Sequence, residues 1–277
     1  MNEKLIINVA PTGMVPTKKE TPHVPLSADE IGDDCAACCA AGASVFHLHA
    51  REPDGAPAYR AEIYREAILK VRSRCPDAIV CVSTSGRNFS EFDKRADVLA
   101  LDDDARPEMA SLTLGSMNFP RQASVNEPAM IRRLAERMRE RQIVPELEIF
   151  DLGMIDYAKY LIDRGVLAEP FYFNLLLGSL GTLSATPFHL AMLVNSLPAD
   201  STWAGAGIGG FQFAVNAMAV TMGGHVRVGL EDNLYMDSEK RQLATNAGLV
   251  ERIARLARAC EREVATPEDA RAMIGLP

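Results

Sequence analysis

Short apolar segments of strand length alternate along this chain with longer segments whose apolar residues recur at helical spacing. The short segments are rich in Val, Ile, Leu and Phe and end at polar or Gly-containing stretches, a pattern typical of buried β-strands. Eight such strands are expected, at residues 5–10, 44–50, 79–84, 109–114, 144–150, 171–177, 202–207 and 225–230.

Each expected strand is followed by a segment with the repeat of an amphipathic helix. These helices are expected at residues 27–41, 61–74, 91–101, 128–142, 155–164, 187–197, 212–222 and 243–260. Ser27 and Glu30 stand at capping-box spacing at the start of the first helix, and Thr266-Pro267 starts a further short helix near the C-terminus.

Eight strand-then-helix units in succession predict an α/β fold, a (β/α)8 TIM barrel with a short C-terminal helical extension. A doubly wound open sheet is the alternative, but such a sheet more often has about five or six strands and a Gly-rich first turn. Because no linker, repeat or low-complexity stretch interrupts the pattern, residues 1–277 are expected to form a single domain.

The composition excludes several classes of protein. With 48% hydrophobic and 24% charged residues, the 277-residue chain has the make-up of a globular protein rather than a disordered one. A net charge of -8 and an aromatic fraction of 6% argue against nucleic-acid and membrane-surface binding. The apolar stretches are shorter than a membrane helix, and the six cysteines fit reduced thiols, so a cytoplasmic location is expected.

A barrel concentrates its chemistry where the strands end, and the second strand ends in Phe46-His47-Leu48-His49-Ala50-Arg51. Alternate residues of a strand face the same way, so His47, His49 and Arg51 project together. Two imidazoles on one face suit a divalent metal such as zinc. The alternative is one histidine packed in the core and one that is merely polar.

The eighth strand supplies a third candidate ligand. Arg227 and Glu231 share one face, and in a closed barrel the second and eighth strands lie on either side of the first. Glu231 is therefore expected to join His47 and His49 in a site that leaves a position open for water or substrate. Asp232, if paired with Arg227, is a candidate general base, although a purely structural ion pair also fits.

Further polar residues lie along other strands. Glu146 and Glu148 share one face of the fifth strand, and buried carboxylates need partners, for which Arg51 and Arg227 are the candidates. A structural ion-pair layer and a catalytic role fit this pair equally. The Gly-rich turn at residues 207–210 fits either a phosphate site before a helix or a tight turn.

Five motifs together resemble the β-keto acid cleavage enzymes. In chain order they read His-Leu-His-Ala-Arg, Ser-Leu-Thr-Leu-Gly-Ser-Met-Asn-Phe, Pro-Glu-Leu-Glu-Ile-Phe-Asp, Gly-Gly-His-Val-Arg-Val-Gly-Leu-Glu-Asp-Asn and Ala-Thr-Pro-Glu-Asp-Ala-Arg. The resemblance runs from the first strand to the C-terminal helix, and the eighth-strand motif is long and specific.

The resemblance implies a zinc-dependent acyltransferase on a (β/α)8 barrel. Such an enzyme condenses a β-keto acid with acetyl-CoA and yields acetoacetate and a new acyl-CoA. His47, His49 and Glu231 match the family's zinc ligands. Arg227 and Asp232 match the pair that removes the proton from C2 of the keto acid. A homotetramer is also implied.

The resemblance extends to the substrate pocket, with one departure. Ser83 and Thr113 match the positions that hold the substrate carboxylate, and Glu146 matches a supporting carboxylate. The family's prototype, which cleaves 3-keto-5-aminohexanoate, receives the substrate amine on a glutamate after the first strand, where this chain has Val15. A non-amine β-keto acid is therefore expected, either apolar-tailed or dicarboxylic, and Arg87 faces a second carboxylate or solvent.

Two other functions remain open at this point. One is a divalent-metal aldolase or hydrolase on the same barrel that does not use CoA. The other is a non-catalytic binding protein, which predicts no metal. The apolar residues Phe211, Phe213 and Met218 fit either a contact surface between subunits or the core face of a helix.

Overall fold

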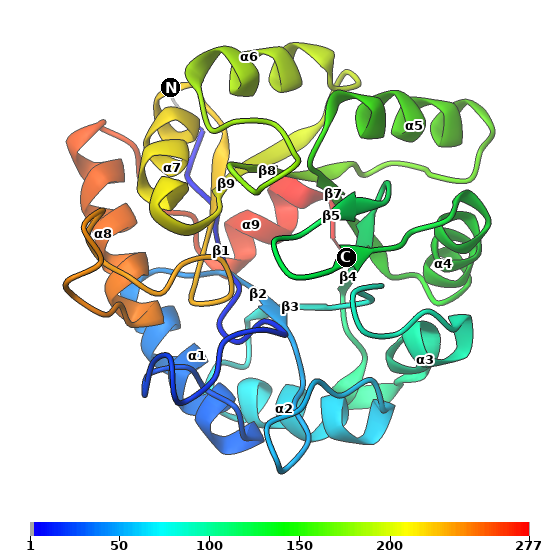
Figure 1. Cartoon of the computed structure of the whole chain (residues 1–277), viewed down its shortest axis with the longest axis horizontal. Helices are drawn as coiled ribbons and strands as arrows, with labels where there is room; N and C mark the ends of the chain where they lie inside the picture. The colour runs from blue at the N-terminus through cyan, green and yellow to red at the C-terminus, as the bar shows by residue number, and fades with distance from the viewer. Residues whose placement is uncertain (1–2, 277) are drawn as a thin grey trace.

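The computed structural model describes residues 3–276, and its centre is a closed barrel of parallel strands (Figure 1). The eight barrel strands are β1 (Ile7–Val9), β2 (Val45–Leu48), β3 (Ile79–Val82), β4 (Met109–Thr113), β7 (Val144–Ile149), β8 (Tyr172–Leu177), β9 (Thr202–Gly207) and β10 (His225–Val228). Their order around the barrel is β1-β10-β9-β8-β7-β4-β3-β2, so the predicted TIM barrel is confirmed.

Helices α1 to α8 form the outer ring in Figure 1, and α9 lies at its centre. Their bounds are α1 (Ala28–Ala41), α2 (Ala61–Arg74), α3 (Phe92–Ala96), α4 (Pro128–Glu140), α5 (Leu152–Asp163), α6 (Pro187–Ser196), α7 (Gln212–Thr221), α8 (Asn246–Ala259) and α9 (Pro267–Ile274). Short 3-10 turns are η1 (Asp97–Ala100), η2 (Asp103–Ala105) and η3 (Gly209–Phe211). In residues 3–276, no helix combines the length and the apolar character that crossing a membrane requires.

One expected helix is divided in the structure. The pattern over residues 91–101 predicts a continuous helix, whereas α3 ends at Ala96 and η1 continues the chain in a tighter winding. The Asp97 carboxylate accepts a hydrogen bond from the backbone N–H of Ala61 at 2.7 Å and so caps the start of α2. This contact between distant segments is not visible in a local apolar pattern.

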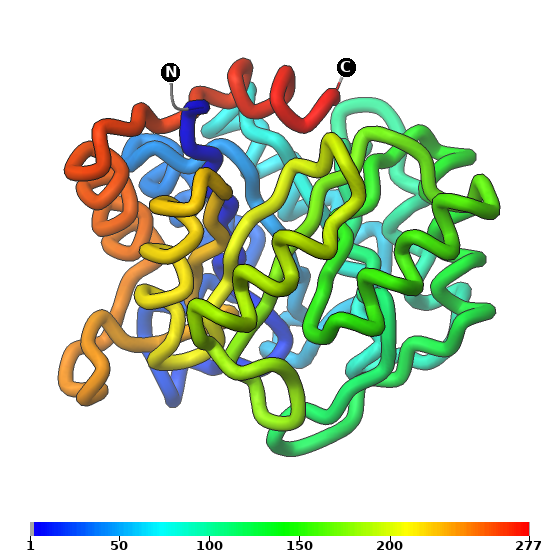
Figure 2. The backbone as a smooth tube through the Cα atoms, turned by 90° about the horizontal axis from the view of Figure 1, so that it is seen from above, coloured from blue at the N-terminus to red at the C-terminus, as the bar shows by residue number. Residues whose placement is uncertain are grey.

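Two separate hydrophobic layers hold the barrel. The larger layer lies between the strands and the outer helices. The smaller one fills the inside of the barrel at its amino-terminal end, where Ile6, Ile79 and Tyr172 pack with Ala270 and Ile274 of α9. Figure 2 shows α9 lying across that end, with the long strand-to-helix loops at the opposite end. The C-terminal helix therefore closes the bottom of the barrel and leaves the other end open.

A small antiparallel hairpin, β5 (Met117–Asn118) with β6 (Ala123–Ser124), rises from the open end after β4. It is tied to the neighbouring loop by Arg95, which is almost fully buried. Its guanidinium donates to the carbonyl of Thr84 at 2.9 Å and to Asn126 Oδ1 at 2.7 Å. The loops after β3 and β4 therefore form one connected wall of the mouth.

A buried amide fastens the strand ends that carry the candidate site. Asn246 Oδ1 accepts the backbone N–H of Leu230 at 2.8 Å, and its Nδ2 donates to the carbonyl of Pro11 at 3.1 Å. The same Nδ2 donates to Asp34 Oδ2 at 2.7 Å. Residues that directly follow β1 and β10 are thereby held to α1 and α8. Burial raises the pKa of Asp34 to about 6, against the stabilising bond from Asn246.

Because the pKa of Asp34 is higher in the folded chain, its contribution to stability is largest below its ordinary pKa and is lost as the pH rises through about 6. The variant Asp34→Asn can keep the Asn246 bond through its amide oxygen and has no charge to desolvate. The difference in unfolding free energy between this variant and wild type should therefore shift by about 1 kcal/mol in favour of the variant when the pH rises from 5 to 7.5. Urea unfolding at the two pH values measures this, and an unchanged difference would contradict it.

Candidate active site

The two histidines of β2 and a glutamate after β10 meet at the open end of the barrel. β1 pairs with both β2 and β10, as the sequence predicts, so the two flanking strands bring these side chains together. His47 Nε2 lies 3.2 Å from His49 Nε2. Glu231 Oε1 lies 3.3 Å from His49 Nε2, and its Oε2 lies 3.9 Å from His47 Nε2.

These spacings fit a divalent cation. Ligand atoms about 2.0 Å from a tetrahedral zinc ion stand about 3.3 Å from one another, close to two of the three separations here. Glu231 Oε2 is buried and has no hydrogen-bond partner among the described residues. When two ring nitrogens and a carboxylate converge in this way, their lone pairs face and repel one another. A bound cation relieves this repulsion. His47, His49 and Glu231 are thus a chemically suitable ligand set.

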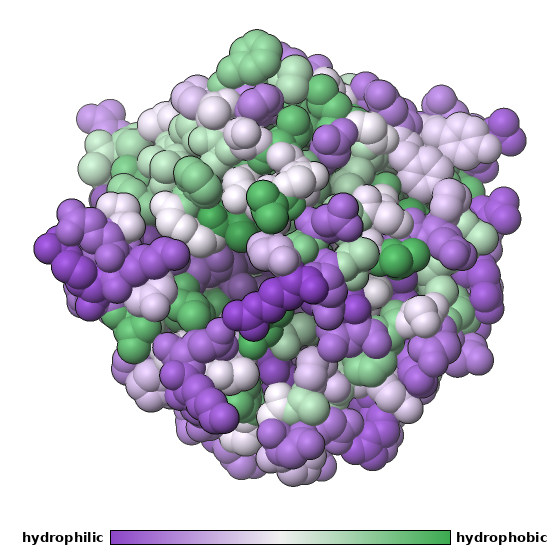
Figure 3. Space-filling model, viewed as in Figure 1, coloured by the Kyte–Doolittle hydropathy of each residue, from purple (hydrophilic) through white to green (hydrophobic). Residues whose placement is uncertain are grey.

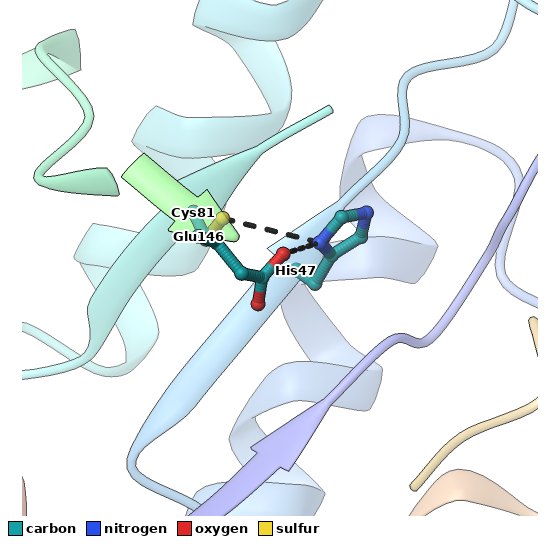
Figure 4. Close-up of side chains that lie close together, drawn as sticks. All are labelled: His47, Cys81 and Glu146. Atoms are coloured by element: carbon teal, nitrogen blue, oxygen red, sulfur yellow. Dashed lines mark hydrogen bonds and ion pairs between the residues drawn. The ribbon is translucent and has the colours of Figure 1, made fainter. Parts of the chain in front are cut away.

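Glu146 contacts His47, one of the candidate ligands, and orients its ring (Figure 4). Its Oε2 is 2.5 Å from His47 Nδ1, and its Oε1 accepts from Asn8 Nδ2 at 2.7 Å. A proton on Nδ1 that is donated to Glu146 leaves Nε2 free as a ligand. Burial opposes ionisation of Glu146, but the charges of His47 and Arg227 lower its pKa to about 2. Cys81 Sγ completes this buried group, 3.9 Å from His47 Nδ1.

Arg227, 1% exposed, is surrounded by carboxylates from β7 and from the loop after β10. Its Nη1 donates to Glu148 Oε1 at 3.1 Å and its Nε to Asp232 Oδ2 at 3.0 Å. Its Nη2 lies 3.2 Å from Glu231 Oε1, and Nη1 lies 3.9 Å from Glu146 Oε2. The predicted pairing of Arg227 with Asp232 is present, together with its predicted pairing to the β7 glutamates.

The carboxyl of Asp232 faces the pocket with a raised pKa. Burial raises it and the Arg227 charge opposes the rise, with a result of about 6. Its neighbour Glu231 behaves oppositely, because His49 and Arg227 outweigh burial and hold its pKa well below the ordinary value. Glu231 is therefore a poor base that suits a bound cation, and the adjacent Asp232 is the better proton acceptor.

The turn after β1 packs directly on the candidate metal ligand. Gly13 has a φ of 63°, and a Cβ at this position would lie 2.7 Å from Glu231 Cγ. Arg51, the third residue of the His-x-His-x-Arg face, supports the same turn by donating to the carbonyl oxygens of Gly13 and Pro16 at 2.8 and 3.0 Å. Arg51 was one of two candidate partners for the β7 glutamates. Of the two arginines, only Arg227 makes ion pairs with them among the described residues.

A pocket of about 590 Å³ opens above these groups. Eight of the nine site residues predicted from the sequence line it, and Glu146 lies behind them. The eight are His47, His49, Ser83, Arg87, Thr113, Arg227, Glu231 and Asp232. Figure 3 shows the hollow at the centre of this face. The Thr113 hydroxyl donates to Glu148 Oε2 at 2.6 Å, so the expected contact between Thr113 and a substrate carboxylate requires this hydroxyl to turn.

Some pocket residues escape prediction from the sequence. Phe119 of the hairpin and Phe150 after β7 form an aromatic wall, with their rings 5.8 Å apart and nearly perpendicular. Both belong to motifs that were singled out for their polar residues, so their position was a usable signal. The turn at residues 207–210 is tight for steric reasons, since a Cβ at Gly207 would lie 2.3 Å from the carbonyl oxygen of Phe211.

The fold and the site define a class of protein, a TIM-barrel enzyme with a candidate two-histidine, one-carboxylate metal site beside an Arg–Asp pair. The sequence matches the family model described as beta-keto acid cleavage enzyme over residues 4–276. This chain belongs to that family, so the resemblance drawn from its motifs and the expectation of an acyltransferase are confirmed.

Named relatives extend over the whole chain. The 3-keto-5-aminohexanoate cleavage enzyme of Fusobacterium nucleatum is 42% identical, over 100% of this chain and 99% of its own length. The 3-oxoadipate:acetyl-CoA acetyltransferase of Cupriavidus necator is 37% identical, over 100% of this chain and 96% of its own. The solved structure of ObcA with oxaloacetate shares the fold, with a TM-score of 0.83 at 22% identity, covering 92% of this chain and 68% of ObcA.

Removal of the Arg227 charge should destabilise the protein strongly, because it leaves four neighbouring carboxylates without their shared cation. The variant Arg227→Met is expected to lose about 3–5 kcal/mol of unfolding free energy at pH 7.5. The loss should shrink at pH 5, where the unpaired carboxylates take up protons. Urea unfolding measures both values, with Arg227→Lys as the charge-preserving control. A loss independent of pH would contradict this account.

Proposed function

We propose that the protein is a zinc-dependent enzyme that condenses a β-keto acid with acetyl-CoA. The bond between C2 and the keto carbon of the acid is broken, C2 with its carboxylate takes the acetyl group to give acetoacetate, and CoA takes the remaining acyl fragment. The observation that carries the proposal is the pairing of Asp232, a proton acceptor with a pKa of about 6, with the candidate ligand set one residue away. Family membership and the relative named as an acetyl-CoA acetyltransferase support it.

The residues divide the chemistry among them. The Asp232 carboxylate takes the proton from C2 of the keto acid, while Arg227 Nε holds that carboxylate in place at 3.0 Å. Ser83 lines the pocket, and its Oγ accepts the backbone N–H of Ser85 at 3.2 Å, which leaves its own proton free for a substrate carboxylate. The open mouth admits the thioester to the carbon that has lost its proton.

His47, His49 and Glu231 would hold the zinc ion, with Glu146 and Asn8 fixing the ring of His47. When bound, zinc supplies a positive charge that acidifies C2 of the keto acid. The pocket lining carries three arginines against three carboxylates, so a bound cation would make its net charge positive and favour an anionic substrate.

The pocket does not suit an amine. Its lining carboxylates are Glu148, Glu231 and Asp232, and each lies within 3.2 Å of an Arg227 nitrogen. At the β1 turn, Val15 presents an apolar side chain to the same pocket. An ammonium tail would therefore find no carboxylate of its own, which supports a non-amine β-keto acid as substrate.

An assay of acetoacetate formation tests the reaction. The purified protein is incubated with a panel of β-keto acids, each with and without acetyl-CoA. We expect acetoacetate only when acetyl-CoA is present, and at least tenfold lower kcat/KM for 3-keto-5-aminohexanoate than for the best non-amine acid. Cleavage without CoA would favour a metal-dependent aldolase or hydrolase instead. Equal turnover of 3-keto-5-aminohexanoate would contradict the interpretation that Val15 disfavours a substrate with an amine.

Metal analysis tests the ligand set. The purified protein should carry about one zinc per chain, and His49→Ala should lose most of it. His23→Ala is the matched control, because His23 is exposed on the loop before α1 and belongs to no ligand set among the described residues. Wild-type protein without a stoichiometric divalent metal would contradict the zinc assignment.

We also propose a homotetramer in the cytoplasm, formed by the single domain of residues 1–277. Residues 171–222 contain one Asp, Glu, Lys or Arg, Asp200, and they include the exposed Leu180, Phe188, Phe211 and Phe213. In Figure 3 hydrophobic side chains gather over the α6 and α7 side of the mouth. Such a surface is typical of a contact between copies, and six free cysteines fit a reducing compartment.

Phe188→Glu should weaken this contact, because Phe188 is 71% exposed and a charge there would be desolvated on association. We expect a smaller particle in light scattering coupled to size exclusion. Tyr160→Glu, at an exposed aromatic of α5, is the control that keeps the wild-type mass. An unchanged mass for Phe188→Glu would contradict the assigned surface.

A further inference from the structure

Arg87 is the cation of the pocket that lacks a counter-ion. It lies in the loop after β3, lines the pocket, and makes no ion pair within residues 3–276, whereas Arg227 in the same pocket contacts several carboxylates. Its Nε is buried and has no hydrogen-bond acceptor within the same range. A desolvated and unpaired guanidinium is costly unless an anion arrives to pair with it.

The Arg87 side chain is held in place rather than extended into solvent. Its guanidinium carbon lies over the ring of Phe119, 3.6 Å from the ring centroid. Phe119 is fixed in turn by its contact with Phe150 and by its backbone bond to the carbonyl of Gln122 at 2.9 Å. Gln122 Nε2 donates back to the carbonyl of Arg87 at 3.1 Å. The hairpin and the β3 loop thus present a preorganised cation to the pocket.

The position of Arg87 suits the far end of a short substrate. Its charge is attracted by Glu231, Glu148 and Asp232, and none of them contacts it, so it stands away from the reacting groups but in the same pocket. Burial lowers the pKa of Arg87 from its very high ordinary value, and the side chain stays charged at neutral pH. Leu176 and Ile208 line the same pocket and add apolar surface against which a carbon chain can pack.

We propose that Arg87 binds a second carboxylate at the far end of the β-keto acid, so that the substrate class is the β-keto dicarboxylic acids. This inference rests on the proposed function and narrows its substrate. A guanidinium pairs with a carboxylate through parallel N–H donors. The phosphates of CoA are a weaker fit, because a long arm separates them from the thioester and the exposed Arg121 lies at the outer rim of the pocket.

A matched substrate pair tests this assignment. 3-Oxoadipate and 3-oxohexanoate have the same chain length and differ in a terminal carboxylate against a methyl group. For the wild-type protein with acetyl-CoA, we expect kcat/KM to favour the diacid by roughly 10- to 100-fold, the range of one charged hydrogen-bonding contact. In Arg87→Leu this ratio should fall close to one, mainly through a higher KM for the diacid, and Arg87→Lys should restore part of it.

Arg121→Leu is the matched control, since it removes an arginine from the rim of the same pocket and should preserve the ratio. A wild-type preference for 3-oxohexanoate would overturn the inference and leave the proposed function standing. A raised KM for acetyl-CoA in Arg87→Leu, with the diacid ratio intact, would overturn it as well, by making Arg87 a CoA contact. Turnover of neither acid would contradict the proposed function itself. The wild-type ratio tests the substrate class even if the Arg87 variants do not fold.

Discussion

The inside of this barrel depends on one arginine. Arg227, on β10, stands where β7 and the loop after β10 bring four carboxylates together, and it is the cation that all of them share. Buried carboxylates repel one another strongly unless a charge of opposite sign is held among them. With Arg227 in place, Glu231 can remain ionised beside the two histidines, and Asp232 lines the pocket as an oriented carboxyl group. The candidate metal site and the candidate base thus share one electrostatic support.

Three layers along the barrel axis differ in composition and in what their side chains do. The lower interior is apolar and is filled by side chains of the strands and α9. The middle layer, with Asn8, Glu146 and His47, sets the orientation of one imidazole. The loops at the mouth, with Arg87 and Phe119, shape the part of the pocket distant from the reacting groups. Changes in the loops can therefore alter which acid is accepted while the layers below stay intact.

Much of this could be predicted from the sequence, for a physical reason. Strand alternation placed His47 and His49 on one face, and barrel closure placed Glu231 beside them, because both follow from backbone geometry. What periodicity cannot supply is contact between distant loops. The stacking of Arg87 on Phe119, the division of the helix after β3 at Asp97, and the clamp formed by Asn246 each join segments far apart in the chain. Arg51 is a further example. Strand alternation predicts that it faces the same way as the histidines, but not that it donates hydrogen bonds to backbone carbonyl groups.

The seal formed by α9 has a consequence for the order of folding. Ala270 and Ile274, close to the last residue of the chain, pack against Ile6, close to the first, inside the barrel. β1 also pairs with β10, so the first strand finds its second neighbour only after most of the chain has been synthesised. Contacts of such long sequence separation form late, because the intervening chain must be ordered first. During synthesis the barrel therefore has an open seam beside β1 until β10 has emerged from the ribosome, and its amino-terminal end stays uncovered until α9 has emerged.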